Sequence, residues 1–284
     1  MNYRHAFHAG NHTEILKHAV LVQLLGHLRG KESPFFVLDT HAGLGFYDLT
    51  SDEAQRTNES SAGIKRVINA NIPHAEPYLA FVRSINVGGS VTRYPGSPAI
   101  VQHLLRQSDG LAACELHNDD VDQLKRNFRG DRRIGVHHRD GYEAVKALLP
   151  PQQGRGLVFI DPPFERPDEV ARLLDAIELI GRRWPAAVTA VWYPIKNPEN
   201  VDQFKDGLRR RSAFPVLTVE VVLHPEDGIV LAGGGVVVVR PPWKIEGIFR
   251  ELANGILRAF EAKKGRASVQ WIVTENDLQA RARH

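Results

Sequence analysis

The sequence predicts an α/β fold built on a mostly parallel β-sheet, and three observations support this prediction. Short apolar runs, typical of buried strands, alternate along the chain with segments of helical periodicity. Most of these runs end in a polar residue or a glycine-containing turn. The length of 284 residues and the hydrophobic content of 43% are sufficient for one large core. Strands and helices that alternate in this way indicate a parallel sheet covered by helices.

The first predicted element is a helix that follows a short polar arm. Asn11 is a suitable N-cap, and Glu14 follows it at the spacing of a capping box. The helical pattern continues to about Arg29, and Gly30 is expected to end the helix.

The strands and the main later helices are predicted from the same periodicity. Strands are expected at 35–39, 111–115, 134–138, 157–161, 187–192, 216–223, 236–240 and 268–273. A helix is expected over 98–107, with Ser97 as its cap and Pro98 at its first position. A second helix is expected over 168–183, where the apolar residues fall on one face.

Residues 48–94 interrupt this alternation. The stretch is polar, carries weak helical patterns at 63–70 and 76–85, and separates the first strand from its expected helix. If the stretch were disordered, Tyr78, Leu79 and Phe81 would have no core to join. We therefore expect 48–94 to be a small helical insertion subdomain. Residues 1–47 and 95–284 would then form the core, with an N-terminal arm and helix.

The composition limits which cellular compartment and which binding partners we expect. Lys and Arg exceed Asp and Glu by 36 to 33, so phosphate binding would require local patches rather than a strongly basic chain. Cys114 is the only cysteine, which excludes an internal disulfide and a cysteine-rich zinc site and predicts a reducing compartment, the cytoplasm. The chain has neither the apolar run of a signal peptide nor one long enough to span a membrane, so we expect no export and no membrane insertion.

Residues at the ends of three successive predicted strands indicate a nucleoside cofactor. The turn after the first strand, Asp39-Thr-His-Ala-Gly-Leu-Gly45, allows a ligand to approach the backbone, but it lacks the full dinucleotide fingerprint. Glu115 ends the second strand and can accept hydrogens from ribose hydroxyls, while Asp140, before Gly141, can accept from an adenine amine. Each feature alone is common in doubly wound folds; their order favours a bound adenosine.

The most specific motif is Asp161-Pro162-Pro163-Phe164, which follows an apolar strand. The lone pair of an adenine N6 is delocalised into the ring, so methyl transfer requires acceptors that hold the amine hydrogens. Asp161 and the carbonyl of Pro162 are the candidate acceptors, and Phe164 offers a ring on which a flipped base can stack. The alternative, a simple strand-ending turn, is less favoured because the motif follows the fourth strand. Arg240-Pro-Pro-Trp243 is excluded as the catalytic loop because arginine has no acceptor.

With these motifs in place, the chain resembles the large-subunit ribosomal RNA adenine-N6 methyltransferase family called methyltransferase J. The resemblance spans essentially the whole length. The motifs that carry it are Tyr3-Arg-His-Ala-Phe-His-Ala-Gly-Asn-His12, Leu16-Lys-His18, Leu38-Asp-Thr-His-Ala-Gly43, Tyr94-Pro-Gly-Ser-Pro98, Glu115-Leu-His117, Asp140-Gly141, Trp192-Tyr-Pro194 and Pro241-Pro-Trp-Lys244.

The resemblance implies a monomeric, Rossmann-like class I methyltransferase with a helical insertion, which uses S-adenosylmethionine to methylate one adenine of 23S rRNA before ribosome assembly. The residues that it implies as cofactor contacts are His18, His41, Ser97, Glu115, Asp140, Gly141 and Asp161. It implies Asp161 as the catalytic acceptor and Tyr3 as a contact to the RNA. The family motif often ends in tyrosine, so Phe164 is expected to keep the stacking but to lose a hydroxyl hydrogen bond.

Other functions compete with this one. DNA adenine-N6 methylation uses the same motif, but a DNA-recognition domain would normally be larger than residues 48–94. Methylation of a glutamine side chain usually requires Asn in place of Asp161, and a non-catalytic, cofactor-binding RNA chaperone would not need Asp161 and Phe164. A zinc site at His5, His8 and His12 is not expected, because no cysteine or suitably spaced third ligand accompanies them. The basic clusters at 132–133, 182–183, 209–211 and 263–266 are not assigned to RNA, because most such runs are solvated helix faces.

Overall fold

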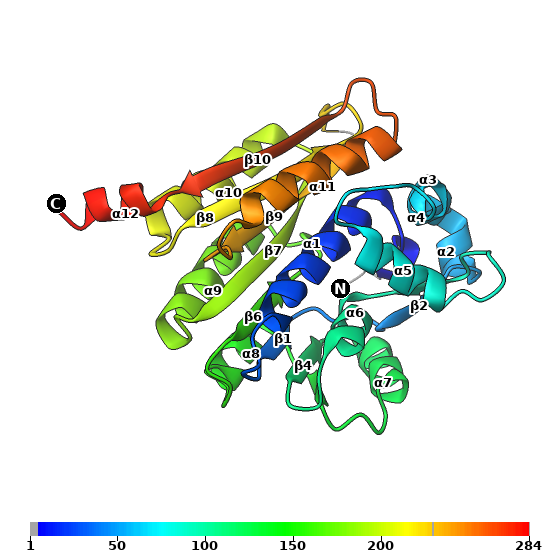
Figure 1. The fold of residues 1–284 in the computed structure, drawn as a ribbon, viewed down its shortest axis with the longest axis horizontal. Coiled ribbons are helices and arrows are strands. Elements are labelled where there is room, and N and C mark those ends of the chain that lie inside the picture. The colour runs from blue at the N-terminus through cyan, green and yellow to red at the C-terminus, as the bar shows by residue number, and fades with distance from the viewer. Residues whose placement is uncertain (1–4, 229, 284) are drawn as a thin grey trace.

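The computed structural model describes residues 5–228 and 230–283, in which an eight-stranded sheet forms the centre of the molecule (Figure 1). The strand order is β10-β8-β9-β7-β6-β1-β4-β5. The strands are β1 (Phe36–Asp39), β4 (Gly110–Glu115), β5 (Ile134–His138), β6 (Gly156–Ile160), β7 (Ala187–Ile195), β8 (Val216–Val222), β9 (Gly233–Val239) and β10 (Arg266–Val273).

Most neighbouring strands in this sheet run parallel. β5, β4, β1, β6 and β7 pair in parallel, whereas β9 runs antiparallel to β7 and β8, and β10 runs antiparallel to β8. β1 and β6 are buried because helices cover both faces of the sheet, which explains their uninterrupted apolar sequences. The prediction of a mostly parallel α/β sheet is confirmed.

Helices cover both faces of the sheet (Figure 1). One face packs against α1 (His12–Arg29), α6 (Ser97–Leu104), α7 (Asn118–Asn127) and α11 (Ile245–Ala259). The other face packs against α8 (Gly141–Leu148), α9 (Glu169–Arg183) and α10 (Pro198–Arg211). A short η1 (His5–Phe7) precedes α1, and α12 (Glu275–Arg281) follows β10. No helix within the described residues has both the length and the apolarity needed to cross a bilayer.

Helix α1 begins and ends where the sequence predicts. The Asn11 side chain accepts hydrogen bonds from the backbone N–H groups of Thr13 and Glu14, and Gly30 is the C-cap. The predicted capping box is wrong in one respect. The Asn11 backbone N–H donates to the His8 carbonyl at 3.1 Å rather than to Glu14, whose carboxylate contacts Lys17 and His5.

Residues 48–94 contain more helix than their sequence pattern suggests. A two-stranded antiparallel ladder, β2 (Phe46–Asp48) and β3 (Arg93–Pro95), joins the two ends of the stretch, and these strands were not predicted. Between them lie α2 (Asp52–Thr57), α3 (Glu59–Ala62), α4 (Ile64–Val67) and α5 (Glu76–Ser84). The apolar residues of α5 join the core around α1, which accounts for their hydrophobic character. The division of the chain into a core and a separate insertion subdomain stays a prediction.

Two further sequence predictions are corrected at helix starts. Gly96 is the N-cap of α6, and Ser97 is its first helical residue rather than its cap. Asp140 lies beyond the end of β5 and caps α8 with its side chain, so it is a helix cap rather than a strand-end residue. In both cases the amino end of a helix lies at the edge of the sheet where the parallel strands end.

Candidate active site

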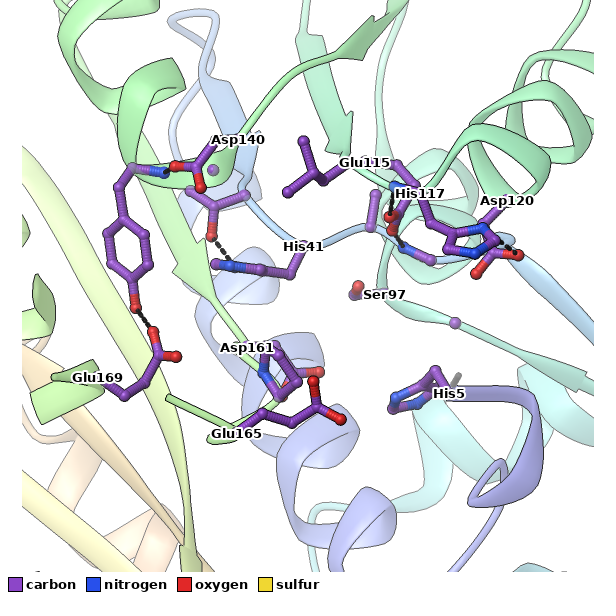
Figure 2. Close-up of a pocket in the computed structure, with 18 of the residues that line it drawn as sticks. His5, His41, Ser97, Glu115, His117, Asp120, Asp140, Asp161, Glu165 and Glu169 are labelled. Atoms are coloured by element: carbon purple, nitrogen blue, oxygen red, sulfur yellow. Dashed lines mark hydrogen bonds and ion pairs between the residues drawn. The ribbon is translucent and has the colours of Figure 1, made fainter. Parts of the chain in front are cut away.

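A cavity of about 550 Å³ opens at the carboxyl ends of β1, β4, β5 and β6. It brings together all the residues that the sequence predicts as cofactor contacts, namely His18, His41, Ser97, Glu115, Asp140, Gly141 and Asp161. Figure 2 shows five of them, His41, Ser97, Glu115, Asp140 and Asp161, around this space. The strand ends converge here because parallel strands place all their carboxyl ends on one edge.

Glu115 holds the turn that follows β1. One carboxylate oxygen, Oε2, accepts from the Gly43 backbone N–H at 2.9 Å, and Oε1 accepts from the His117 backbone N–H at 2.8 Å. Burial raises the pKa of this carboxyl above its usual range, although the backbone hydrogen bonds oppose the shift. Each oxygen has about two acceptor sites, so each retains one for a ligand hydroxyl.

Asp140 is fixed by three donors. Its Oδ1 accepts from the backbone N–H groups of Tyr142 and Glu143, at 2.9 and 3.1 Å, and its Oδ2 accepts from Arg172 Nη2 at 3.1 Å. Burial alone would raise the pKa of this carboxyl, but the Glu143 hydrogen bond and Arg172 lower it below its usual value. Arg172 also lies over the Tyr142 ring, 4.2 Å from its centre. Arg172 lines the cavity from α9 and was not predicted, because no motif links it to Asp140.

The cavity wall also presents two neutral histidines and the amino end of a helix. Burial lowers the pKa of His41 to about 4 and that of His18 to about 3, so both rings are neutral at physiological pH. Gly96 and Ser97 bring the amino end of α6 to the cavity, where backbone N–H groups favour an anion. Gly141 is required by close packing, because a Cβ there would lie 2.4 Å from the Thr40 carbonyl oxygen.

Asp161 stands between this cavity and a second, smaller one of about 160 Å³. Both cavities are lined by His5, Lys17, Asp161 and Pro163. Trp192 lines the smaller cavity and not the larger one. A carboxylate in this position can contact a group in either space, which suits a residue that acts between two ligands.

A buried ion-pair network fixes Asp161. Lys17 Nζ lies 2.5 Å from Asp161 Oδ2 and also pairs with Glu14, one helical turn earlier on α1. Burial alone would lower the pKa of Lys17, but the charges of Asp161 and Glu14 outweigh it and raise that pKa. Burial would likewise raise the pKa of Glu14, yet Lys17 holds it well below its usual value. The Lys17 charge therefore persists although the side chain is only 3% exposed.

The role of Lys17 was missed in the sequence predictions, although a signal was present. Helix α1 is apolar on nearly every face, and Glu14 and Lys17 are charged residues at i and i+3 within it. Such a pair in a buried helix must find partners inside the protein. Ligand atoms of His5, Glu14 and Asp161 lie within 4.8 Å of one another, as at a metal site, but the Lys17 ammonium already binds two of these groups.

Phe164 lies beside Asp161 but faces neither cavity in this structure. Its ring meets the Trp192 ring edge-on, with the centres 5.9 Å apart, and its φ of +53° is unusual for a residue with a side chain. Pro162 is buried and also lines neither cavity. The predicted roles of Phe164 in stacking and of the Pro162 carbonyl as an acceptor stay predictions. Tyr3, the predicted RNA contact, lies outside the described residues.

Half of the residues in the basic clusters pair with acidic neighbours. Arg211 pairs with Asp175 and Glu178, and Arg266 pairs with Glu220 and Glu226. Arg133 and Arg209 likewise pair with nearby aspartates, and Arg182 pairs with Glu178. These clusters therefore offer less free positive charge to a phosphate backbone than their sequences suggest.

Comparison with known proteins agrees with this geometry. The model of a family described as ribosomal RNA large subunit methyltransferase D, RlmJ, matches residues 32–273. The chain is 36% identical to ribosomal RNA large subunit methyltransferase J of Escherichia coli (strain K12), and the match covers 97% of this chain and 100% of the relative. Identity and coverage are the same for the protein of that name in Haemophilus influenzae. A solved structure from Legionella pneumophila is 31% identical, with a TM-score of 0.87 over 93% of this chain and 98% of that one.

Replacing Lys17 with methionine is expected to destabilise the protein strongly. The variant leaves the Glu14 and Asp161 carboxylates buried without their cation, which typically costs about 3–5 kcal/mol. Urea unfolding of Lys17→Met measures this loss, and adding Glu14→Gln should recover a large part of it. A loss below about 1 kcal/mol, as for an exposed ion pair, would show that the network is not buried as described.

Asp39, the last residue of β1, is expected to make stability depend on pH. Burial, together with the charge of Asp161, raises the pKa of its carboxyl from 3.8 to about 7. The folded state therefore binds this proton more tightly than the unfolded state, so the free energy of unfolding falls as pH rises to about 7 and then levels off. From about pH 5 to about pH 8, the wild type should lose roughly 2–3 kcal/mol more than Asp39→Asn. Equal losses in urea unfolding of the two proteins would contradict the raised pKa.

Proposed function

The chain belongs to the ribosomal RNA large subunit methyltransferase J family, and from this membership we propose that it transfers a methyl group from S-adenosylmethionine to the exocyclic N6 of one adenine in 23S rRNA. It is an enzyme that methylates ribosomal RNA. The observation that carries the finer proposal is the position of Asp161 on the common wall of the two cavities, with Lys17 bound to only one of its oxygens.

The larger cavity fits S-adenosylmethionine, whose sulfonium supplies an electrophilic methyl group when bound. Glu115 has an acceptor site free on each oxygen for the ribose hydroxyls, and Asp140 Oδ2 has one for the adenine amine. At the other end, the amino end of α6 with Ser97 and His18 suits the carboxylate of the amino-acid part. His41 would be a further contact between these ends, and Gly141 would be one beside Asp140.

Asp161 would bind the target amine of a base that lies in the smaller cavity. Lys17 binds Asp161 Oδ2, which leaves Oδ1 to accept a hydrogen from the adenine N6. The Pro162 carbonyl is the second proposed acceptor. The nitrogen would gain positive charge as its bond to the methyl carbon forms and the carbon–sulfur bond of the sulfonium breaks, and it would then lose one N–H proton. A fixed carboxylate would stabilise that charge. The ion pair with Lys17 holds that carboxylate in place before the base arrives.

The remaining assignments follow from the motif and the family. Phe164 would stack on the flipped base, and Tyr3 would contact the RNA. Family membership favours ribosomal RNA over DNA or a glutamine side chain, and an ion-paired Asp161 between two cavities favours catalysis over an RNA chaperone without activity. We propose a monomer that acts in the cytoplasm on 23S rRNA.

The direct test is methyl transfer from labelled S-adenosylmethionine to protein-free large-subunit rRNA that lacks its native modification, followed by digestion to nucleosides. We expect the label in N6-methyladenosine. Label in another nucleoside would overturn the proposed N6 chemistry. Incorporation into DNA or a glutamine peptide, with none into rRNA, would overturn the proposed substrate.

Asp161→Ala is expected to reduce methyl transfer by roughly a hundredfold to a thousandfold, because the developing charge loses its acceptor. Phe164→Ala should cost less, roughly five- to a hundredfold, which corresponds to the stacking of one base. Rates are measured at saturating cofactor, with circular dichroism to confirm that both variants fold. Turnover in Asp161→Ala equal to that of the wild type would refute its catalytic assignment.

A further inference from the structure

A buried chain of hydrogen bonds connects α5 with the wall of the larger cavity. The Tyr78 hydroxyl lies 2.8 Å from the Tyr94 hydroxyl, which lies 2.9 Å from Nδ1 of His18. Both tyrosines are 0% exposed and His18 is 1% exposed. His18 also lines the cavity, so one edge of its ring faces the hydroxyl chain while the ring borders the ligand space. The chain joins residues of α5, β3 and α1.

The direction of these hydrogen bonds follows from which of the buried O–H groups have an acceptor. Within 5–228 and 230–283, Tyr78 has no hydrogen-bond partner for its hydroxyl other than Tyr94. If Tyr78 donates to Tyr94, then Tyr94 donates to His18 Nδ1, and every buried O–H has an acceptor. In the opposite direction His18 donates to Tyr94, Tyr94 donates to Tyr78, and the Tyr78 proton has no acceptor. A buried donor without a partner disfavours that arrangement by roughly tenfold to a hundredfold.

His18 is neutral, so it carries its proton on only one nitrogen. Burial lowers the pKa of His18 to about 3, and the negative charge of Glu14, opposed by Lys17, does not restore it. When Nδ1 accepts a hydrogen bond, the proton of a neutral imidazole is on Nε2. This nitrogen then becomes a donor rather than an acceptor for a ligand.

We propose that Tyr94 is a positioning residue that fixes the Nε2–H tautomer of His18, so that this histidine donates a hydrogen bond to the carboxylate of the bound cofactor. The assignment of the carboxylate rests on the proposed function, whereas the tautomer is a property of the unliganded protein. A donor here complements the amino end of α6, which meets the same cavity at Gly96 and Ser97.

Tyr78 supplies a matched control from the same chain. In Tyr78→Phe the Tyr94 hydroxyl still has one acceptor, His18 Nδ1, so the tautomer stays the same. In Tyr94→Phe no hydroxyl reaches Nδ1, and the preference for Nε2–H weakens. The double variant, Tyr78→Phe with Tyr94→Phe, removes both hydroxyls and leaves no orphaned donor, so it serves if Tyr94→Phe alone is unstable.

The tautomer is measured by a long-range ¹H–¹⁵N correlation spectrum of the unliganded protein labelled with ¹⁵N-histidine, and His18→Gln identifies the signals of His18. We expect Nε2–H in the wild type and in Tyr78→Phe, and a mixture of tautomers in Tyr94→Phe and in the double variant. A wild-type His18 protonated on Nδ1, or a Tyr94→Phe spectrum identical to that of Tyr78→Phe, would overturn the proposal.

Calorimetric binding of S-adenosylhomocysteine tests the consequence for the ligand. Tyr94→Phe should bind it roughly two- to tenfold more weakly than the wild type, as expected for one lost hydrogen bond, while Tyr78→Phe should bind it unchanged. The difference should disappear with the decarboxylated analogue, which has no group to accept from Nε2. An equal loss with both ligands would show that Tyr94 acts on the fold and not on the carboxylate. If the wild type binds neither ligand, the proposed function fails, whereas the tautomer measurement stands on its own.

Discussion

The buried ammonium group of Lys17 is the interaction on which the candidate site depends. It joins α1, near the start of the chain, to the residue that follows β6, and it balances two carboxylates that would otherwise repel each other in the interior. Taking these charges out of water costs desolvation free energy, which is offset only while all the partners keep close contact. The apolar residues of α1 bury the helix in the core, where the charged pair on the same helix requires a partner, which Asp161 provides. The hydrophobic core and the active-site geometry therefore specify each other.

The strand order explains why the cavity lies next to that network. β1 pairs with β4 on one side and with β6 on the other. The chain therefore first adds strands on one side of β1 and later adds strands on its other side. The crossover connections diverge at this point and leave a crevice at the carboxyl edge. Residues 48–94 are inserted between β1 and β4, yet the β2–β3 ladder brings both ends of that stretch together. The sheet order is therefore kept, and Tyr94, in strand β3 of the ladder, is brought against His18.

The sequence predicts those parts of the structure that depend on local pattern. Buried strands appear as uninterrupted apolar runs, Asn11 has the chemistry of a cap, and acids at strand ends fall at one edge because the strands are parallel. Contacts between distant elements leave no pattern that identifies both partners. Arg172 reaches Asp140 from another helix, and Lys17 reaches Asp161 only after α1 has docked. Strands β2 and β3 are too short for a period to be recognised. The capping box at Glu14 was mispredicted because the Asn11 backbone N–H donates to the His8 carbonyl, while the Glu14 carboxylate contacts Lys17 and His5.

The carboxylates of the site have a common design, in which the protein uses some acceptor positions and leaves others open. Glu115 binds two backbone N–H groups, Asp140 binds two more and Arg172, and Asp161 binds Lys17 through one oxygen. Each group is therefore oriented before a ligand arrives, and little reorganisation accompanies binding. His18 and the amino end of α6 supply donors on another part of the cavity wall. A cavity with acceptors at one end and donors at the other is complementary to a nucleoside that carries an amino acid, and the acceptor Asp161 faces the neighbouring space in which the base would lie.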